Sequence, residues 1–433
     1  MNIQAIYECY LSCSGVSTDT RKIEAGNLFF ALKGPNFDAN SFASKALEIG
    51  AKAVVVDDAS VVPAGDTRYF LVEDALKALQ LLANHHRKHF NFPVIALTGS
   101  NGKTTSKELL YAVLKQSLKT AATTGNFNNH IGVPLSLLAI PLKGTEIAII
   151  EMGANKQGDI QELCDIAEPT HGFITNIGKA HLEGMGGPEG VLKTKTELFQ
   201  HLRVNKGTVF INSQDPILSN MAKRFEHPVL YPAKGDFCEV SFVSADPFVK
   251  FQVEGTEEIF ESSLIGAYNF GNIAAALTIS KYFGVPMEKA VQTVVSYTPS
   301  NMRSQLVEKR SNLIILDAYN ANPSSMEVAI DTFGKMSGKP YKMIILGDMY
   351  ELGEATETEH AKLGELVSKY NFDKICFTGK HIQAALAKAP FRSLYFPDPF
   401  SFRNWLQDSK LEDHHILIKG SRGMKLEGLV DFI

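Results

Sequence analysis

Short apolar runs alternate along this chain with longer segments whose apolar residues recur at helical spacing. Continuous runs such as 53–56 and 147–150 are typical of strands buried in a parallel sheet. Segments such as 43–49 and 75–87 carry the spacing of helices with one buried face. Strands that alternate with helices in this way predict an α/β fold, built on parallel sheets with crossover helices.

The predicted strands form three groups, as expected for a chain of 433 residues, which is too long for one ordinary core. We expect a small N-terminal α/β domain over 1–90, a central parallel-sheet domain over 91–300 and a Rossmann-like C-terminal domain over 301–433. Residues 239–264 have short alternating segments, which predict an antiparallel appendage to the central domain. The predicted strands are 28–32, 53–56, 69–72, 94–98, 147–150, 173–176, 209–212, 313–316, 343–346, 375–377 and 416–418.

The composition is that of a globular protein, with 45% hydrophobic and 21% charged residues. A net charge of −4 gives no reason to expect nucleic acid or a membrane surface as a partner, and no apolar stretch is long enough to span a bilayer. The five scattered cysteines form neither a disulfide framework nor a zinc spacing, which suits a reducing cytosol. The first residues lack the pattern of a signal peptide, so we expect a cytoplasmic protein.

The stretch 94–105 joins a buried strand to a helix through a glycine turn, Thr-Gly-Ser-Asn-Gly-Lys-Thr-Thr. Backbone N–H groups at such a turn, together with the helix N-terminus, favour an anion. Lys103 could reach the β- and γ-phosphates of a nucleotide, and the Thr104 hydroxyl could ligate Mg²⁺. Only two residues separate Gly99 from Gly102, fewer than in the strict phosphate loop, so an ordinary glycine-rich turn is the alternative.

Polar residues follow other strands of the central domain, at the sheet edge where ligands bind in such folds. Glu151 closes an apolar strand and could hold Mg²⁺ against phosphates, although a carboxylate capping the next turn is about as good an explanation. His181 comes after the following strand, where a structural histidine is the usual case. By charge pattern alone, Lys193, Lys195 and Glu197 look like the solvated first turn of a helix.

Two further segments could contact ligands. Residues 317–323, Asp-Ala-Tyr-Asn-Ala-Asn-Pro, place many hydrogen-bonding groups after a predicted strand of the third domain, and Pro323 suits the start of a helix. Residues 17–21, Ser-Thr-Asp-Thr-Arg, could hold a sugar or diphosphate, but a self-capping turn is the default for these residue types.

Taken together, these motifs resemble those of the Mur ligases, amide-forming enzymes of peptidoglycan synthesis. The resemblance runs in order from Ser17 to about Arg422, and it is most specific in Tyr-Asn-Ala-Asn-Pro at 319–323 and Gly-Asp-Met-Tyr-Glu-Leu-Gly at 347–353. One departure is Leu316, where family members often carry a first acidic residue; Asp317 keeps the second. The segments that carry the resemblance are 17–21, 37–40, 98–105, 125–129, 151–155, 176–183, 195–197, 269–272, 319–323, 347–353 and 419–422.

The resemblance implies an ATP-dependent ligase with one domain each for UDP, for ATP and for the incoming amine. Its substrates would be UDP-N-acetylmuramoyl-tripeptide and D-alanyl-D-alanine, joined through an acyl phosphate with Mg²⁺ as cofactor. The catalytic residues would be Lys103, His181, Lys195 and Arg303, and the metal ligands Thr104, Glu151, His181 and a carbamylated Lys195. The ATP site would comprise Gly99, Ser100, Asn101, Gly102, Lys103, Thr104, Thr105, Asn269 and Asp317. The other substrates would meet Ser17, Thr18, Asp19, Asn128, Asn129, Tyr319, Asn320, Asn322 and Arg422.

Two other functions compete with this interpretation. One is a different ligase of the same superfamily, either the Mur ligase that adds the third peptide residue or a folylpolyglutamate synthase. The folate enzymes begin near their phosphate loop, whereas about 90 residues precede the loop in this chain. The other is a nucleotide switch without catalysis, against which the candidate Mg²⁺ ligands on successive strand ends argue. A monomer is expected. The sequence does not distinguish L-lysine from diaminopimelate as the third peptide residue.

Overall fold

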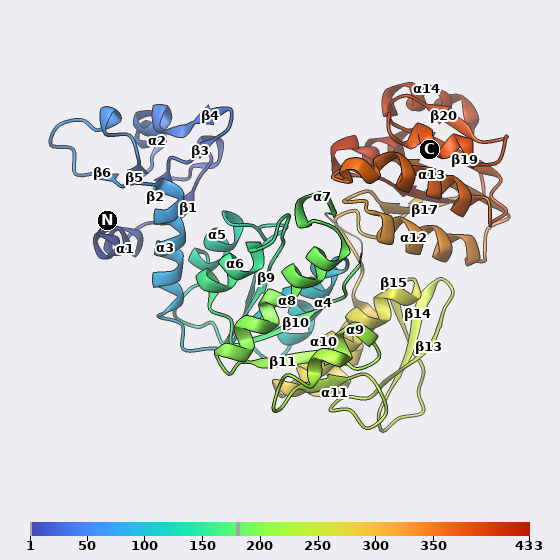
Figure 1. The fold of residues 1–433 in the computed structure, drawn as a ribbon, viewed down its shortest axis with the longest axis horizontal. Coiled ribbons are helices and arrows are strands. Elements are labelled where there is room, and N and C mark those ends of the chain that lie inside the picture. Colours follow the sequence, from blue (N-terminus) through green and yellow to red (C-terminus); the bar gives the residue numbers. More distant parts are fainter. Residues whose placement is uncertain (1, 179–181) are drawn as a thin grey trace.

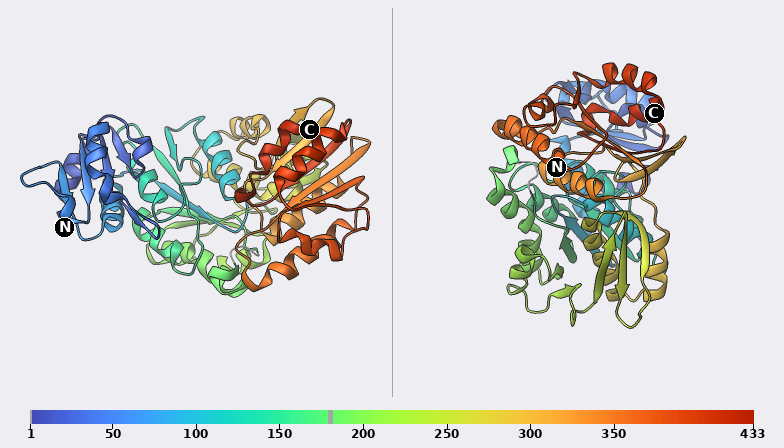
Figure 2. Two further views of the ribbon diagram at one scale, coloured as in Figure 1. Left: turned by 90° about the horizontal axis from the view of Figure 1, so that it is seen from above. Right: turned by 90° about the vertical axis from the view of Figure 1, so that its right-hand side faces the viewer.

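Three α/β units follow one another along an elongated molecule, with the two termini toward opposite ends (Figures 1 and 2). The computed structural model describes residues 2–178 and 182–433. Each unit is built on a mainly parallel sheet, so the predicted α/β architecture is confirmed. Within the described residues, no helix has the length and apolar character needed to cross a bilayer.

The N-terminal unit is a four-stranded parallel sheet in the order β1-β2-β5-β6, with a small β3–β4 hairpin beside it. Its central strands are buried on both faces, as their continuous apolar runs predicted. Helix α3 begins where the Asp74 side chain accepts a hydrogen bond from Lys77 N at 2.9 Å, a standard N-cap. Its elements are α1 (Ile3–Tyr10), β1 (Gly15–Ser17), β2 (Asn27–Phe30), β3 (Lys33–Gly34), β4 (Phe37–Asp38), α2 (Ala43–Ile49), β5 (Ala53–Val56), β6 (Tyr69–Leu71) and α3 (Ala75–Arg87).

The middle unit is a six-stranded parallel sheet in the order β12-β11-β10-β7-β9-β8. Alternate residues of β7 and β9 face two different cores: one contains helices α3, α5, α6 and α8, and the other contains α4, α10 and α11. Its elements are β7 (Val94–Thr98), α4 (Lys103–Leu114), β8 (Thr120–Ala122), α5 (Gly132–Leu138), β9 (Ile147–Glu151), α6 (Asp159–Ala167), β10 (His171–Ile174), α7 (Leu182–Met185), α8 (Pro188–Val204), β11 (Thr208–Asn212), α9 (Pro216–Ala222), β12 (Val229–Tyr231), α10 (Phe270–Tyr282) and α11 (Met287–Ser296).

The predicted appendage is a separate antiparallel sheet of three strands, β13 (Val240–Ala245), β14 (Phe248–Val253) and β15 (Phe260–Ile265). Buried residues alternate along β14, so one face of this sheet packs on the core that also holds α10 and α11. The appendage returns the chain to Tyr268 and Asn269, immediately before α10.

The C-terminal unit is a six-stranded sheet in the order β16-β17-β21-β18-β19-β20, parallel except for β16. The two edge strands, β16 and β20, were not predicted. Its elements are β16 (Gln305–Lys309), β17 (Asn312–Asp317), α12 (Pro323–Lys335), β18 (Tyr341–Gly347), α13 (Thr356–Val367), β19 (Lys374–Thr378), β20 (Leu394–Phe396), α14 (Pro399–Ser409) and β21 (His414–Lys419).

The connection between the first two units is packed. The rings of Phe90 and Phe92 stack with centroids 4.7 Å apart, both are buried, and α3 lies against α5 and α6 of the middle unit (Figure 1). Phe90 and Phe92 therefore belong to a core that the two units share. The exact limits of the three domains stay a prediction.

Candidate active site

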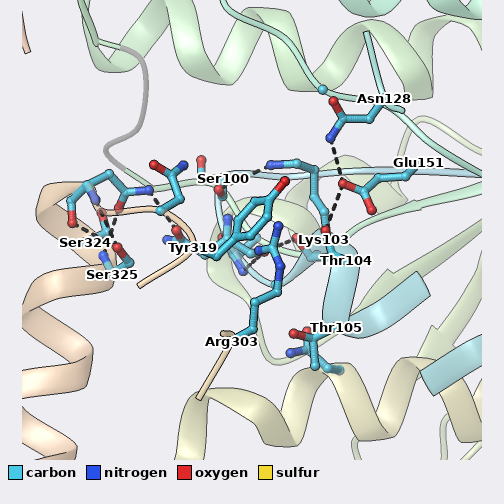
Figure 3. Close-up of a pocket in the computed structure, with 18 of the residues that line it drawn as sticks. Ser100, Lys103, Thr104, Thr105, Asn128, Glu151, Arg303, Tyr319, Ser324 and Ser325 are labelled. Carbon is cyan, nitrogen blue, oxygen red and sulfur yellow. Dashed lines mark hydrogen bonds between the residues drawn. The ribbon is translucent and has the colours of Figure 1, made fainter. Parts of the chain in front are cut away.

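A pocket of about 630 Å³ lies between the middle and C-terminal units, at the carboxyl ends of β7, β9 and β10 (Figure 3). Many of the residues singled out by sequence meet there. Those that line it are Ser100, Asn101, Gly102, Lys103, Thr104, Thr105, Asn128, Asn129, Glu151, Asn269, Arg303, Asp317, Tyr319, Asn320 and Asn322.

The glycine turn has the backbone that a phosphate loop requires. Gly102 is the left-handed N-cap of α4, with φ of +77°. Gly99 has φ of +149°, and a Cβ there would lie 2.0 Å from the Thr175 hydroxyl oxygen. The tip of the loop is held by Asn176, which accepts from Asn101 N and donates to Asn101 O, both at 3.0 Å. The loop is therefore fixed before any ligand binds.

Lys103 is the first residue of α4, and its ammonium folds back to donate to Gly99 O at 2.8 Å. Burial lowers the pKa of Lys103 to about 8, although the Glu151 carboxylate acts in the opposite direction. An ammonium held inside the loop is placed to contact phosphate oxygens.

Glu151 ends β9 with its carboxylate only 1% exposed. Its Oε1 accepts hydrogen bonds from Thr104 Oγ1 at 3.1 Å and from Asn128 Nδ2 at 2.7 Å (Figure 3). Its Oε2 is buried and has no hydrogen-bond partner within 2–178 and 182–433. A buried carboxylate oxygen without a partner is costly, and a bound cation would satisfy it. The donor set, a hydroxyl and a carboxylate beside the loop, therefore fits Mg²⁺.

Lys195 does not lie in a solvated first turn. Helix α8 begins at Pro188, so Lys195 is in the middle of the helix and is 1% exposed, and its Nζ has no hydrogen-bond partner among the described residues. Burial, together with the Lys103 ammonium, lowers the pKa of Lys195 to about 7. Glu197 is engaged as well, because it accepts hydrogen bonds from Gly158 N and Gln161 N. The charge pattern alone predicted the solvated first turn of a helix, and this prediction is wrong for Lys195 and Glu197.

His181 lies outside the residues that the structure describes. Across 2–178 and 182–433, no three histidine, cysteine, aspartate or glutamate side chains converge as a preformed metal cluster. This does not conflict with the magnesium prediction, because Mg²⁺ commonly takes one or two protein carboxylates and completes its shell with phosphate oxygens and water.

The C-terminal unit contributes a cation and an aromatic ring to the opposite wall. The Arg303 guanidinium lies 3.9 Å from the centre of the Tyr319 ring (Figure 3), and in the part of the chain that the structure describes its buried Nε has no hydrogen-bond partner. Asp317 forms an ion pair with the buried Lys419 and accepts from Ser304 N at 3.3 Å. Leu316 packs in the core on the other side of β17, so only Asp317 faces the pocket.

Asn322 connects the two units directly. Its Oδ1 accepts from Ser325 N at 2.8 Å in a capping box that starts α12, and its Nδ2 donates to Asn101 Oδ1 at 2.9 Å. The phosphate loop and the C-terminal unit are therefore already in contact.

Some predicted residues lie away from this pocket. Ser17, Thr18 and Asp19 belong to the N-terminal unit, where Asp19 caps the turn and binds the Arg21 guanidinium through both oxygens. Arg422 pairs with Glu427 at 2.8 Å. Gly99 and Lys195 do not line the pocket, but Gly99 shapes the loop and Lys195 is close enough for its pKa to depend on Lys103.

Several pocket residues lie in segments that carry the resemblance but were given no role of their own from sequence, among them Asn176, Asn272 and Lys419. Asn272 accepts from Ser106 Oγ and donates to Asn269 Oδ1, which sets the side chain of Asn269. Asn176 is the last residue of the predicted strand 173–176 and Lys419 directly follows the predicted strand 416–418, so both lie where the strand-end rule that singled out Glu151 places ligand contacts.

Comparison with known proteins agrees with this geometry. Three family models match in order: the Mur ligase family catalytic domain over 12–87, the Mur ligase middle domain over 97–280 and the Mur ligase glutamate ligase domain over 302–422.

Curated relatives and solved structures are similar over nearly the whole chain. The UDP-N-acetylmuramoyl-tripeptide–D-alanyl-D-alanine ligase of Bacillus subtilis is 36% identical over 96% of this chain and 92% of its own length. The MurF structure from Acinetobacter baumannii superposes with a TM-score of 0.86 at 29% identity, covering 99% of this chain and 97% of that one. The MurF ligase of Thermotoga maritima, solved in complex with ADP, gives 0.84 at 29% identity over 98% and 97%. The chain belongs to the Mur ligase family.

Proposed function

We propose that this chain is an ATP-dependent ligase that joins D-alanyl-D-alanine to UDP-N-acetylmuramoyl-tripeptide during synthesis of the peptidoglycan precursor. The observation that carries the proposal is the buried Glu151 carboxylate, which is bonded to Thr104 of the phosphate loop and whose Oε2 has no partner among the residues described. That arrangement supports transfer of a phosphoryl group with a divalent cation in place.

The reaction requires an activated carboxyl group, because a carboxylate is a poor electrophile. The terminal carboxylate of the tripeptide attacks the γ-phosphorus of ATP, and ADP leaves. The amine of D-alanyl-D-alanine then attacks the acyl phosphate, loses a proton, and expels phosphate through a tetrahedral intermediate. Two anions approach each other in the first step, so Lys103 and Arg303 would offset charge on the transferring phosphoryl group.

Mg²⁺ fits the same wall of the pocket. Thr104 and Glu151 would hold one ion, and His181 with a carbamylated Lys195 would hold a second. The metal would supply positive charge that screens the acceptor carboxylate from the γ-phosphate.

The remaining assignments follow the family resemblance and the placement of each residue. Asn269 and Asp317 would contact the nucleotide, and Asn128 and Asn129 would face the muramoyl-peptide. The D-alanyl-D-alanine would be positioned by Tyr319, Asn320 and Asn322. Ser17, Thr18 and Asp19 would bind the UDP end in the N-terminal unit, and Arg422 would meet substrate when the domains close. We further propose that the protein acts as a monomer in the cytoplasm.

The direct test is release of ADP and phosphate by the purified chain. We expect release with UDP-N-acetylmuramoyl-tripeptide plus D-alanyl-D-alanine, and none when glutamate or a single amino acid replaces the dipeptide. Tripeptides ending in L-lysine and in diaminopimelate should both be supplied. Turnover with glutamate or a single amino acid alone would identify another ligase of the superfamily, and nucleotide binding without phosphate release would indicate a switch.

Domain closure is a second expected result. Because the pocket has walls from two units, ATP and acceptor together should draw the C-terminal unit further onto the middle unit and exclude water from the acyl phosphate. Small-angle scattering should report a smaller radius of gyration with both ligands than with neither. Identical curves would contradict the closure.

Replacement of Asn322 tests the dipeptide site. Asn322→Ser keeps a side chain able to cap α12 but removes the amide that donates to Asn101, so the fold should survive. We expect a higher KM for D-alanyl-D-alanine or a lower kcat, with ADP affinity retained, and Asn322→Ala should show the same change. If ADP affinity collapses while the dipeptide parameters stay constant, Asn322 serves the phosphate loop instead.

A further inference from the structure

Two adjacent charged residues, Lys107 and Glu108, lie one turn beyond Lys103 on α4, with Lys107 Nζ 3.9 Å from Glu108 Oε1, and they form hydrogen bonds to different segments. Lys107 is 3% exposed, and neither Lys107 nor Glu108 lines the pocket. Neither side chain is therefore placed to contact the nucleotide. Both side chains are nevertheless fully engaged with segments that complete the site.

Lys107 holds the start of the loop 123–129, whose far end carries Asn128 and Asn129. Its ammonium donates to Thr123 O at 2.9 Å and to Gly125 O at 3.1 Å. Thr123 in turn accepts a hydrogen bond from Glu151 N at 3.1 Å. Lys107 therefore fastens to the phosphate-binding helix both the acceptor-facing loop and the strand end that presents Glu151.

The loop 123–129 has little packing behind it. Residues 124–127 are exposed, and a cavity of about 580 Å³ is lined by Lys107, Thr123, Thr124 and Phe127. At its far end the loop is tied by Gly153 N, which donates to Asn128 O at 2.7 Å. Hydrogen bonds at the two ends, more than apolar contacts, set the position of this loop.

Glu108 holds the linker between the middle and C-terminal units. Its Oε2 accepts from the Tyr297 hydroxyl at 3.0 Å, and its Oε1 accepts from Asn301 Nδ2 at 3.1 Å. Its side chain is 22% exposed, so these bonds are partly shielded from water. The two contacts bracket the linker just before Arg303.

The linker needs such support because its backbone is strained. Asn301, Met302 and Ser304 have φ values of +62°, +56° and +50°, a region that residues other than glycine rarely adopt. Arg303 lies inside this run and stacks on Tyr319 in the pocket. A shift of the linker would therefore move the arginine away from the reacting groups.

We propose that Lys107 and Glu108 are positioning residues, which couple the phosphate-binding helix to the acceptor loop on one side and to the Arg303 linker on the other. The inference rests on the proposed function and deepens it. It requires the two residues to affect different steps, because they hold different segments. Lys107 serves binding of the muramoyl-peptide acceptor, and Glu108 serves the placement of Arg303 during turnover.

The test compares Lys107→Met and Glu108→Ala with matched controls that remove exposed charges, Lys115→Met at the C-cap of the same helix and Glu226→Ala. Lys107→Met should raise the KM for UDP-N-acetylmuramoyl-tripeptide about tenfold. Glu108→Ala should lower kcat about tenfold with that KM unchanged. ADP affinity, measured by calorimetry, should stay within about twofold of wild type in both variants.

Hydrogen exchange gives an independent readout. Amides of 123–129 should exchange faster only in Lys107→Met, and amides of 297–304 only in Glu108→Ala. If Lys107→Met does not fold, Lys107→Gln takes its place, because it keeps a donor at shorter reach and should give a smaller change in the same direction.

The inference is overturned if the two variants change the same kinetic parameter and the same amides, or if neither differs from its control. Failure of the proposed function would look different, because wild-type protein would then release no phosphate with the acceptor and D-alanyl-D-alanine.

Discussion

Replacing Lys103 with alanine is expected to lower turnover by about 10²- to 10³-fold, because a charged donor aimed at a transferring phosphoryl group contributes roughly 3–4 kcal/mol. The fold should be retained. Among the described residues, the Lys103 ammonium bonds only to carbonyl oxygens of its own loop, and loss of such a hydrogen bond costs about 1 kcal/mol. Phosphate release measures the loss, and a thermal melt confirms folding. Turnover like that of wild type would refute the phosphate-loop assignment.

The pH dependence of the wild-type protein supplies a second check on the same residue. With the pKa of Lys103 at about 8, the ammonium is present below that pH and is lost above it. Because kcat/KM reports the free enzyme, kcat/KM for ATP should fall as the pH rises through about 8. Lys115→Ala, which removes an exposed lysine at the C-cap of α4, should leave both turnover and this profile unchanged.

Local pattern predicted well those parts of the site that depend on one strand and the turn after it. Strand β7 and helix α4 flank the glycine turn as expected, and Glu151 is the last residue of β9. In each case a continuous apolar run marks the strand, and the first polar residue after it reaches the binding edge of the sheet.

Contacts between distant segments could not be predicted in this way. The pairing of Lys419 with Asp317 depends on β21 lying beside β17, where these two residues are register partners. The bond from Asn322 to Asn101 depends on how two units dock. The edge strand β16 was missed because its residues, Gln-Leu-Val-Glu-Lys, are mostly polar, as edge strands often are.

The prediction that Lys195 is solvated was wrong for a simpler reason. Pro188 marks the start of α8, so the charged residues at 193–197 could not be its first turn. Val191, Lys195, Leu198 and Leu202 follow one another at helical spacing and are all buried. The position of Lys195 on an apolar helix face therefore predicts that it is buried. Burial of a charged amine is costly unless the charge is paired or removed.

We expect that Lys195 is buried because it is carbamylated, and that loss of the carbamate severely lowers activity. Its pKa is about 7 and no described residue forms a hydrogen bond with its Nζ, so a large share of this amine is neutral at physiological pH. The neutral nitrogen can add to CO₂, forming an N–C bond and releasing a proton. The resulting carbamate offers anionic oxygen, the ligand type that Mg²⁺ prefers, where a free ammonium would repel the metal.

The test is chemical rescue of Lys195→Ala, with Lys193→Ala as the matched control, because Lys193 lies on the same helix and is exposed. We expect Lys195→Ala to lose most activity and to regain part of it when a short carboxylic acid fills the gap, whereas Lys193→Ala keeps wild-type turnover.

The pH dependence of stability gives a second test, in CO₂-free buffer. The pKa of Lys195 in the folded state lies below the unfolded value of 10.5, so at pH values between these two pKa values the unfolded chain binds more protons. Lys195 should therefore make the folded state more stable as pH rises across that window, and Lys195→Met should abolish this contribution. Full activity of unrescued Lys195→Ala, or a bare amine at Lys195 in a crystal structure with ATP and both metals bound, would rule out the carbamate.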